Sequence, residues 1–405
     1  SLLNRETSEI QRWAQHGGQA MTRNLHFTAA EFEARRHRLC EKLKSAGLDA
    51  LVMFRQESMY YMTGYDTFGY VFFQTIVMTA DGRYVLLTRS ADQRQAAFTS
   101  LVDDIRVWAD HADANPSQDL RDILDELGLK GARLGVEYDS YGLTAREGRR
   151  LETQLAGFAT LEDASHLVSE LRVTKSDAEI AYVRRAAELC EAAWDAAVSR
   201  AAPGIDEADI LADMHSAIFR GGGDDPANEF IIGSGPGARM CRYYSGRRKL
   251  DAQDQLTLEF AGTYRHYHSA MMRTIAVGAA PPRQRDLWAA GCDALQACEA
   301  ALKPGNTIGD VFQAHAATLD SAGLSAFRLN ACGYSLGTTF APSWMDGYMA
   351  YAGNPAVIEP GMVIFLHMII FDDETGLAAT PGRTSLVTEA GAEVLSRASL
   401  DLVVK

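Results

Sequence analysis

The sequence predicts an α/β (α+β) protein with two domains, and three observations lead to this prediction. The chain has 405 residues, which is more than one small hydrophobic core organises. Strand signals alternate with helical stretches over the first 170 residues. After that point long helices alternate with pairs of strands. We therefore expect an N-terminal arm at 1–25, a mixed α/β domain at 26–170 and a second domain at 171–405.

The N-terminal domain is predicted from a helix followed by recurring strand signals. Thr28 and Glu31 form a capping box that begins a helix ending at Gly47. The apolar run 49–54 follows and is typical of a buried strand. Further strands are expected over 75–79, 84–87 and 133–137, and a further helix over 117–127. Alternation of this kind predicts a mixed sheet covered by helices.

The second domain is predicted to begin with a long helix. A capping box at Ser176–Glu179 starts this helix, which runs to Ala197. Two more helices are expected over 205–220 and 281–302, because glycine or proline-glycine follows each. The glycine-rich segment 232–237 does not precede a helix, so we expect a loop that lines a pocket.

Composition excludes several classes of function. The formal net charge of -14 argues against binding of a phosphate backbone or an anionic membrane surface. No apolar run approaches the roughly 20 residues that span a bilayer, and the first residues do not form a signal peptide. The six cysteines are scattered and form no close metal-binding pair. These features predict a cytoplasmic protein with a small-molecule substrate, without nucleic-acid or membrane partners.

The most informative stretch is 258–274, which is typical of a strand, a short turn and a second strand. Among strand-forming residues it carries one acid, two histidines and two arginines, namely Glu259, Arg265, His266, His268 and Arg273. Charged groups rarely enter a sheet unless they are paired or functional. The alternative is a hairpin with one ordinary polar face.

This stretch resembles the paired-strand motif of the pita-bread superfamily, which contains the methionine aminopeptidase, prolidase and creatinase families. Its metallopeptidases carry two metal-bridging aspartates before a closing Arg-Thr. Here Arg273-Thr274 supplies that ending, which places the aspartate positions at Glu259 and Ala270. The segment Tyr60–Tyr65 resembles a signature of the family's N-terminal domain. The resemblance implies a creatinase-like N-terminal domain and a C-terminal pita-bread catalytic domain.

The other metal-ligand positions of the superfamily are also altered. Tyr334 stands where the resemblance implies a histidine, and His367 stands where it implies a glutamate. The last position falls on or near Gly382 and Arg383. A two-metal site needs several carboxylates, and this set offers only Glu259. The resemblance therefore implies a degenerate di-metal site, with no metal and no cofactor. The alternative is one weakly held metal on Glu259, His268 and His367.

The sequence around Glu259 is most similar to a metal-free branch of the superfamily. This branch includes the creatinase and ectoine hydrolase families, which cut non-peptide C–N bonds. Glu259–His268 resembles the ectoine hydrolase motif Glu-Ile-Ala-Gly-x-Tyr-Arg-x-Tyr-His. The segments Gly333–Ser335 and Pro342–Trp344 are also similar to that family. The resemblance implies that Glu259 is a nucleophile or a base.

One departure from that branch concerns its upstream catalytic histidine, whose position is Arg242 here. Arginine stays charged and cannot act as a general base, whereas its planar fork suits a carboxylate. The proton-transfer role then passes to His268 or His367. The expected catalytic residues are Glu259, His268, His367 and Tyr334. The expected substrate-binding residues are Arg242, Tyr264, Tyr267, Arg273, Phe230 and Trp344.

Together these residues predict a metal-independent hydrolase that cuts a C–N bond in a small polar amidine of ectoine-like or creatine-like type. Two alternatives stay open: a divergent metal-dependent Xaa-Pro peptidase or aminopeptidase, and a non-catalytic binding protein. The resemblance also implies a homodimer, in which the loop 65–70 borders the partner's active site.

Overall fold

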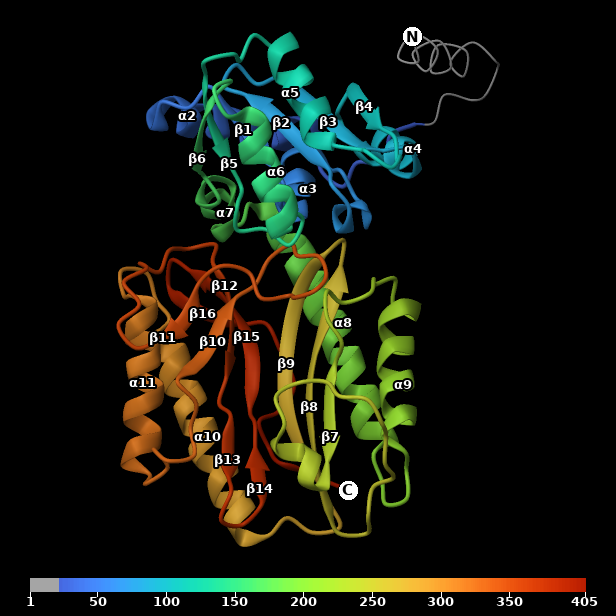
Figure 1. Ribbon diagram of the computed structural model, residues 1–405. Coiled ribbons are helices and arrows are strands. Elements are labelled where there is room, and N and C mark those ends of the chain that lie inside the picture. Colours follow the sequence, from blue (N-terminus) through green and yellow to red (C-terminus); the bar gives the residue numbers. More distant parts are fainter. Residues whose placement is uncertain (1–21) are drawn as a thin grey trace. The chain divides into compact units, whose positions relative to one another are not determined.

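The computed structural model describes residues 22–405 (Figure 1). Most of the expected N-terminal arm, residues 1–21, lies outside the described residues. The chain divides into two compact units between Leu171 and Arg172, next to the boundary expected from the sequence. Within 22–405, no helix is both long enough and apolar enough to cross a membrane.

The N-terminal unit contains a six-stranded mixed sheet in the order β4-β3-β2-β1-β5-β6. Its strands are β1 (Ala50–Met53), β2 (Thr75–Thr79), β3 (Tyr84–Arg89), β4 (Asp104–Trp108), β5 (Arg133–Val136) and β6 (Thr160–Asp163). Its helices are α2 (Ala29–Ala46), α3 (Gln56–Thr63), α4 (Ser90–Thr99), α5 (Pro116–Glu126), α6 (Ala145–Leu155) and α7 (His166–Val173), the last crossing the boundary. Strand β1 is antiparallel to β2 and parallel to β5, which confirms the mixed α/β class. The sequence did not predict β4, β6, α3, α4, α6 or α7.

The C-terminal unit is built on a nine-stranded sheet in the order β11-β10-β12-β15-β9-β8-β7, with β16 beside β15 and β17 beside β9. Its strands are β7 (Ile231–Ser234), β8 (Asp254–Tyr264), β9 (Tyr267–Val277), β10 (Ala331–Ser335), β11 (Met349–Tyr351), β12 (Val363–His367), β15 (Gly382–Thr388), β16 (Gly391–Val394) and β17 (Val403–Val404). A separate pair joins β13 (Ile370–Asp372) to β14 (Leu377–Ala379). The helices are α8 (Asp177–Arg200), α9 (Glu207–Arg220), α10 (Pro282–Ala301) and α11 (Ile308–Ser321).

Helices cover one face of this sheet, which we call the helix face. Helix α8 packs against β8 and β9, and α10 lies against β12 and β14 (Figure 1). A side chain at Gly262 would come within 1.9 Å of the Ala186 oxygen in α8, so glycine lets the helix lie directly on the strand. Arg383 points the same way, because its guanidinium pairs with Glu299 of α10 at 2.6 Å. We call the opposite face the inner face.

The expected hairpin is present as β8 and β9, joined by the two residues Arg265 and His266. Both have positive φ angles, 50° and 67°, as a two-residue hairpin turn of this type requires. Contacts from elsewhere hold this unusual backbone: Asp224 accepts from the Arg265 N–H at 2.7 Å, and the His266 ring stacks on Phe340. By contrast, the glycine-rich segment expected as a loop contains strand β7, which pairs with β8.

Candidate active site

Strand register gathers the five altered ligand positions on the inner face. Glu259 lies opposite Met272, Met272 opposite Gly382, and Gly382 opposite His367, so one row crosses four strands. Residues directly opposite each other in antiparallel strands share a face, and so do alternate residues along one strand. Ala270 therefore shares the inner face with Met272.

The same reasoning places the fifth position and decides between the two residues expected at the last one. Tyr334 lies opposite Phe365, two residues before His367, and so also belongs to the inner face. Of the two residues expected at the last ligand position, Gly382 faces inward. Arg383 faces the helices.

Glu259 is the buried acid of this row, with only 7% of its surface exposed. The Tyr334 hydroxyl donates to Glu259 Oε1 at 3.1 Å. Burial raises the pKa of Glu259 to about 7, although the Tyr334 hydrogen bond and the Arg242 charge act in the opposite direction. At neutral pH both protonation states are populated, so the group can act as an acid, a base or a nucleophile.

Tyr334 is itself held by Trp344. The indole Nε1–H of Trp344 donates to the Tyr334 hydroxyl oxygen at 2.8 Å, and both side chains are buried. Burial, reinforced by the charge of Glu259, raises the pKa of Tyr334 well above its ordinary value. The phenol therefore keeps its proton at neutral pH and remains a hydrogen-bond donor to Glu259.

His268 lies on the inner face, but both of its ring nitrogens are occupied. Nδ1 is 2.8 Å from the His266 carbonyl oxygen, which can only accept, so Nδ1 must carry the proton. Nε2 accepts from the Ala227 main-chain N–H at 3.0 Å. Burial lowers the pKa of His268 to about 3. The structure thus contradicts the expectation that His268 shuttles a proton or holds a metal, because no lone pair is free.

His367 presents the opposite situation. It is 8% exposed, and its Nδ1 is buried without a hydrogen-bond partner among the described residues. Its ring centroid is 5.6 Å from that of Tyr334. Burial lowers the pKa of His367 to about 4, and the Arg242 charge adds to this effect. The imidazole is neutral at ordinary pH and has one nitrogen available to a bound molecule.

Arg242 lies in the exposed segment between the short 3₁₀ helix Gly235–Arg239 and β8. Its Nη1 donates to the carbonyl oxygen of the neighbouring Cys241 at 2.7 Å. Its charge acts on Glu259, Tyr334 and His367, whose pKa values each include its influence. Within residues 22–405 it forms no ion pair, so its guanidinium is open to an anionic ligand.

Three expected substrate-binding residues lie on the wrong face. Arg273 pairs with Leu258 and is buried on the helix face, where its Nη1 donates to the Gly382 oxygen at 2.6 Å. Tyr264 and Tyr267 lie opposite each other, and both rings contact Tyr182 of α8. One residue of offset along a strand moves a side chain to the other face. The expectation for these three residues was therefore wrong.

Phe230 lies beside the row rather than in it. Its ring stacks on His215 at 4.3 Å and is 6.5 Å from the Trp344 ring. Asn228, two residues earlier, accepts from the Trp344 main-chain N–H at 2.9 Å. All three of Phe230, His215 and Asn228 line a cavity of about 520 Å³. Sequence analysis did not single out Asn228 or His215 as site residues. Their contacts with Trp344 and Phe230 join segments that are distant in the chain.

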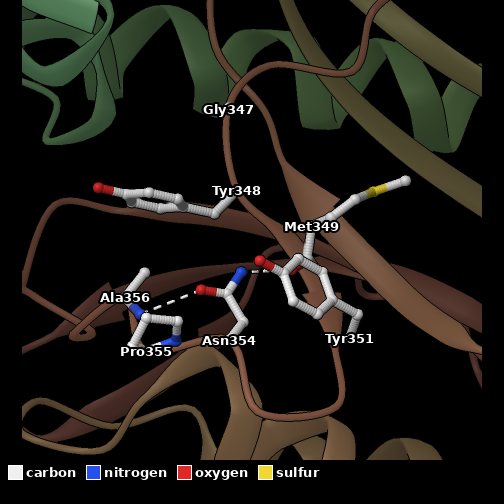
Figure 2. A pocket seen from close by; sticks show the side chains of 7 residues that line it. All are labelled: Gly347, Tyr348, Met349, Tyr351, Asn354, Pro355 and Ala356. Carbon is white, nitrogen blue, oxygen red and sulfur yellow. Dashed lines mark hydrogen bonds between the residues drawn. The ribbon is translucent and has the colours of Figure 1, made fainter.

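A second cavity, of about 500 Å³, surrounds β11 and the turn that follows it. Figure 2 shows Tyr348, Tyr351 and Met349 around it, with Asn354 bonded to the Ala356 N–H at 3.0 Å. Its lining contains no acid, histidine or cysteine, so it offers no group for acid–base or nucleophilic chemistry.

Comparison with known families agrees with this architecture. The model of metallopeptidase family M24 matches residues 181–389, and that of the creatinase/prolidase N-terminal domain matches residues 35–174. The chain belongs to metallopeptidase family M24. It also carries the creatinase/prolidase N-terminal domain, so the expected pita-bread superfamily and its two-domain arrangement are confirmed.

The names of similar proteins in this family indicate different substrates. The chain is 30% identical to an uncharacterized hydrolase/peptidase of Sinorhizobium fredii, covering 93% of this chain and 97% of that protein. It is 27% identical to the ectoine hydrolase of Halomonas elongata, covering 94% and 99%. Among solved structures, a prolidase from Thermococcus sibiricus aligns with a TM-score of 0.83 at 18% identity, covering 92% and 99%. This last likeness concerns the fold alone.

Membership of M24 implies a metal centre, but the residues present do not fit one. Ala270 and Gly382 have no side-chain donor atom, and His268 has no free nitrogen. In the part of the chain that the structure describes, no cluster of three His, Cys, Asp or Glu side chains could hold a metal ion. A single carboxylate cannot bridge and neutralise two divalent ions. The protein is a hydrolase of the creatinase/prolidase family.

Proposed function

We propose that the protein hydrolyses a C–N bond in a small polar amidine that carries a carboxylate, without a metal. The observation that carries this proposal is the state of Glu259: a buried acid with a pKa of about 7, bonded to Tyr334 where metallopeptidases of the family place metal ligands. An acid that titrates near neutrality is suited to general base or nucleophilic catalysis.

In the proposed reaction the Glu259 carboxylate removes a proton from a water molecule that attacks the amidine carbon, or it attacks that carbon itself and forms a covalent intermediate that water then hydrolyses. Oxygen adds to the carbon, the C–N bond breaks, and its electron pair stays on the departing nitrogen. That nitrogen then takes the proton that Glu259 removed from water, and the neutral His367 can relay it because its Nδ1 has no partner in the described structure. Tyr334 donates a hydrogen bond to the carboxylate and then to the oxygen that develops charge.

Arg242 is proposed to hold the substrate's carboxylate. Its guanidinium is exposed, forms no ion pair with the described residues and lies within electrostatic range of Glu259. A planar guanidinium binds a carboxylate by two parallel hydrogen bonds, which fix the orientation of a small ligand. The 27% identity to an ectoine hydrolase over 94% of the chain supports an ectoine-like substrate.

A second candidate is a metal-dependent Xaa-Pro peptidase, which the 24% identity to a Xaa-Pro dipeptidase of Pyrococcus furiosus over 67% of this chain favours. The two candidates differ in their need for metal. Purified protein would be mixed with ectoine, creatine or a Xaa-Pro dipeptide, each with and without EDTA, and followed by NMR. Turnover of ectoine or creatine that persists in EDTA is the expected result. Dipeptide cleavage that EDTA abolishes would overturn the proposal, and inertness toward all three would favour a non-catalytic binding protein.

A further inference from the structure

The Tyr334 hydroxyl has a second hydrogen-bond partner besides Glu259, the indole of Trp344. We propose that Trp344 is a positioning residue: its indole N–H holds the Tyr334 oxygen so that the hydroxyl proton is directed at Glu259. The catalytic consequence rests on the proposed function, whereas the hydrogen-bond arrangement does not depend on any substrate.

The direction of the two hydrogen bonds follows from the chemistry of the groups. An indole N–H can only donate, and an ionised carboxylate can only accept. The Tyr334 hydroxyl lies between them, 2.8 Å from Trp344 Nε1 and 3.1 Å from Glu259 Oε1. Its oxygen must therefore accept from Trp344, and its single proton is left for Glu259. While Glu259 is ionised, the tyrosine has no other arrangement that satisfies both neighbours.

Groups that take no part in the chemistry hold Trp344 in place. The indole is 1% exposed, and its main-chain N–H donates to the Asn228 side chain at 2.9 Å. Its ring lies 6.3 Å from the His268 ring and 6.5 Å from the Phe230 ring. His268 is fixed by main-chain groups on both nitrogens, so the imidazole beside the indole is held in one orientation. This gives His268 a structural role in the site.

Loss of the indole N–H would leave the Tyr334 oxygen buried with one acceptor site unpaired. The hydroxyl would then turn away or recruit water, and its hydrogen bond to Glu259 would weaken, because linked hydrogen bonds strengthen one another. The indole N–H is occupied by the Tyr334 oxygen in this arrangement. Its loss is therefore expected to lower kcat and to leave KM nearly unchanged.

The first test is spectroscopic and needs no substrate. Indole ¹H–¹⁵N spectra would be recorded for the wild type, W344F, Y334F and E259Q; the chain has five tryptophans. W344F assigns the Trp344 signal, which is expected to move in both Y334F and E259Q. The matched control is Trp288, also buried, whose Nε1–H donates to the Leu400 oxygen at 2.7 Å and whose signal should stay. If W344F does not fold, the one signal that moves in both other variants serves instead.

The second test uses whichever substrate the protein turns over. W344F is expected to lower kcat about tenfold with KM within about twofold, while W288F leaves both unchanged. The double variant W344F/Y334F should lose no more than Y334F alone, because Trp344 acts only through Tyr334. Additive losses, or a Trp344 signal indifferent to Y334F, would overturn the inference. Lack of turnover would count against the proposed function, and the spectra would still decide the positioning role.

Discussion

Two buried tyrosine–glutamate pairs lie on opposite faces of the same sheet. On the inner face the Tyr334 hydroxyl donates to Glu259 at 3.1 Å, and on the helix face the Tyr267 hydroxyl donates to Glu179 at 2.8 Å. Glu179 also accepts from the Ser176 main-chain N–H at 2.9 Å, which completes the capping box of α8. Within the described residues Glu259 has Tyr334 as its one donor.

The difference teaches how to separate a structural acid from a reactive one. Each donor that a buried carboxylate gains favours its charged form and uses a lone pair that a substrate would need. The two carboxylate oxygens of Glu179 accept hydrogen bonds from the Ser176 main-chain N–H at the helix cap and from the Tyr267 hydroxyl. Glu259 is left poorly solvated, which raises its pKa to about 7 and keeps it available for reaction.

The largest effect is expected from removing the charge of each glutamate in turn. E259Q should lower turnover by about a thousandfold or more while the fold is kept, because an amide is neither a base nor a nucleophile. E179Q should leave turnover unchanged and lower the free energy of unfolding by about 1 kcal/mol through the weakened cap. Initial rates and denaturant unfolding measure both. Full activity of E259Q would show that this carboxylate is not the reactive group.

The tyrosines give a smaller version of the same comparison. Y334F should lower kcat about a hundredfold, since it removes a hydrogen-bond donor from the reacting centre. Y267F should lower the free energy of unfolding by about 1 kcal/mol and leave kcat unchanged. Steady-state kinetics and thermal unfolding of both variants check this. Equal losses of kcat in Y334F and Y267F would contradict the assignment of catalysis to the inner face and of stability to the helix face.

The remaining effect changes no rate and concerns the pH dependence of stability. The pKa of Glu259 is raised to about 7, so the folded state binds this proton more tightly than the unfolded chain does. The stabilisation is complete below the unfolded pKa and is lost as pH rises through 7. E259Q has no such dependence, so it should exceed the wild type by roughly 3 kcal/mol at pH 8 and match it near pH 4. Thermal unfolding of both proteins at pH 4 and pH 8 measures this. If burial did not shift the pKa of Glu259, the difference in stability between E259Q and the wild type would be the same at both pH values.

The sequence predicted the hairpin and the row of altered positions, but it assigned residues to the wrong face. Tyr264, Tyr267 and Arg273 are polar and adjacent to the motif, yet they contact α8 or bury behind the sheet. Gly262 carried a usable signal, because a glycine inside a strand often marks close approach of another backbone. Glu259 is an odd number of residues from Gly262 and therefore faces away from α8.

Other features could not be predicted because they depend on distant segments. His268 is satisfied by the main chain of Ala227, 41 residues earlier, so its sequence context does not distinguish it from His367. Trp344 was expected to bind substrate, whereas its indole N–H bonds Tyr334. Both roles follow from loops that meet only in the folded protein.

Gly382 sets a limit on how this protein can change. A β-carbon there would lie 2.9 Å from the Leu366 oxygen and 3.1 Å from the His367 β-carbon. A carboxylate therefore cannot return to position 382 unless His367 or its strand gives way, and Ala270 would still supply no ligand. A donor side chain at position 382 therefore requires a second, compensating change in the neighbouring strand.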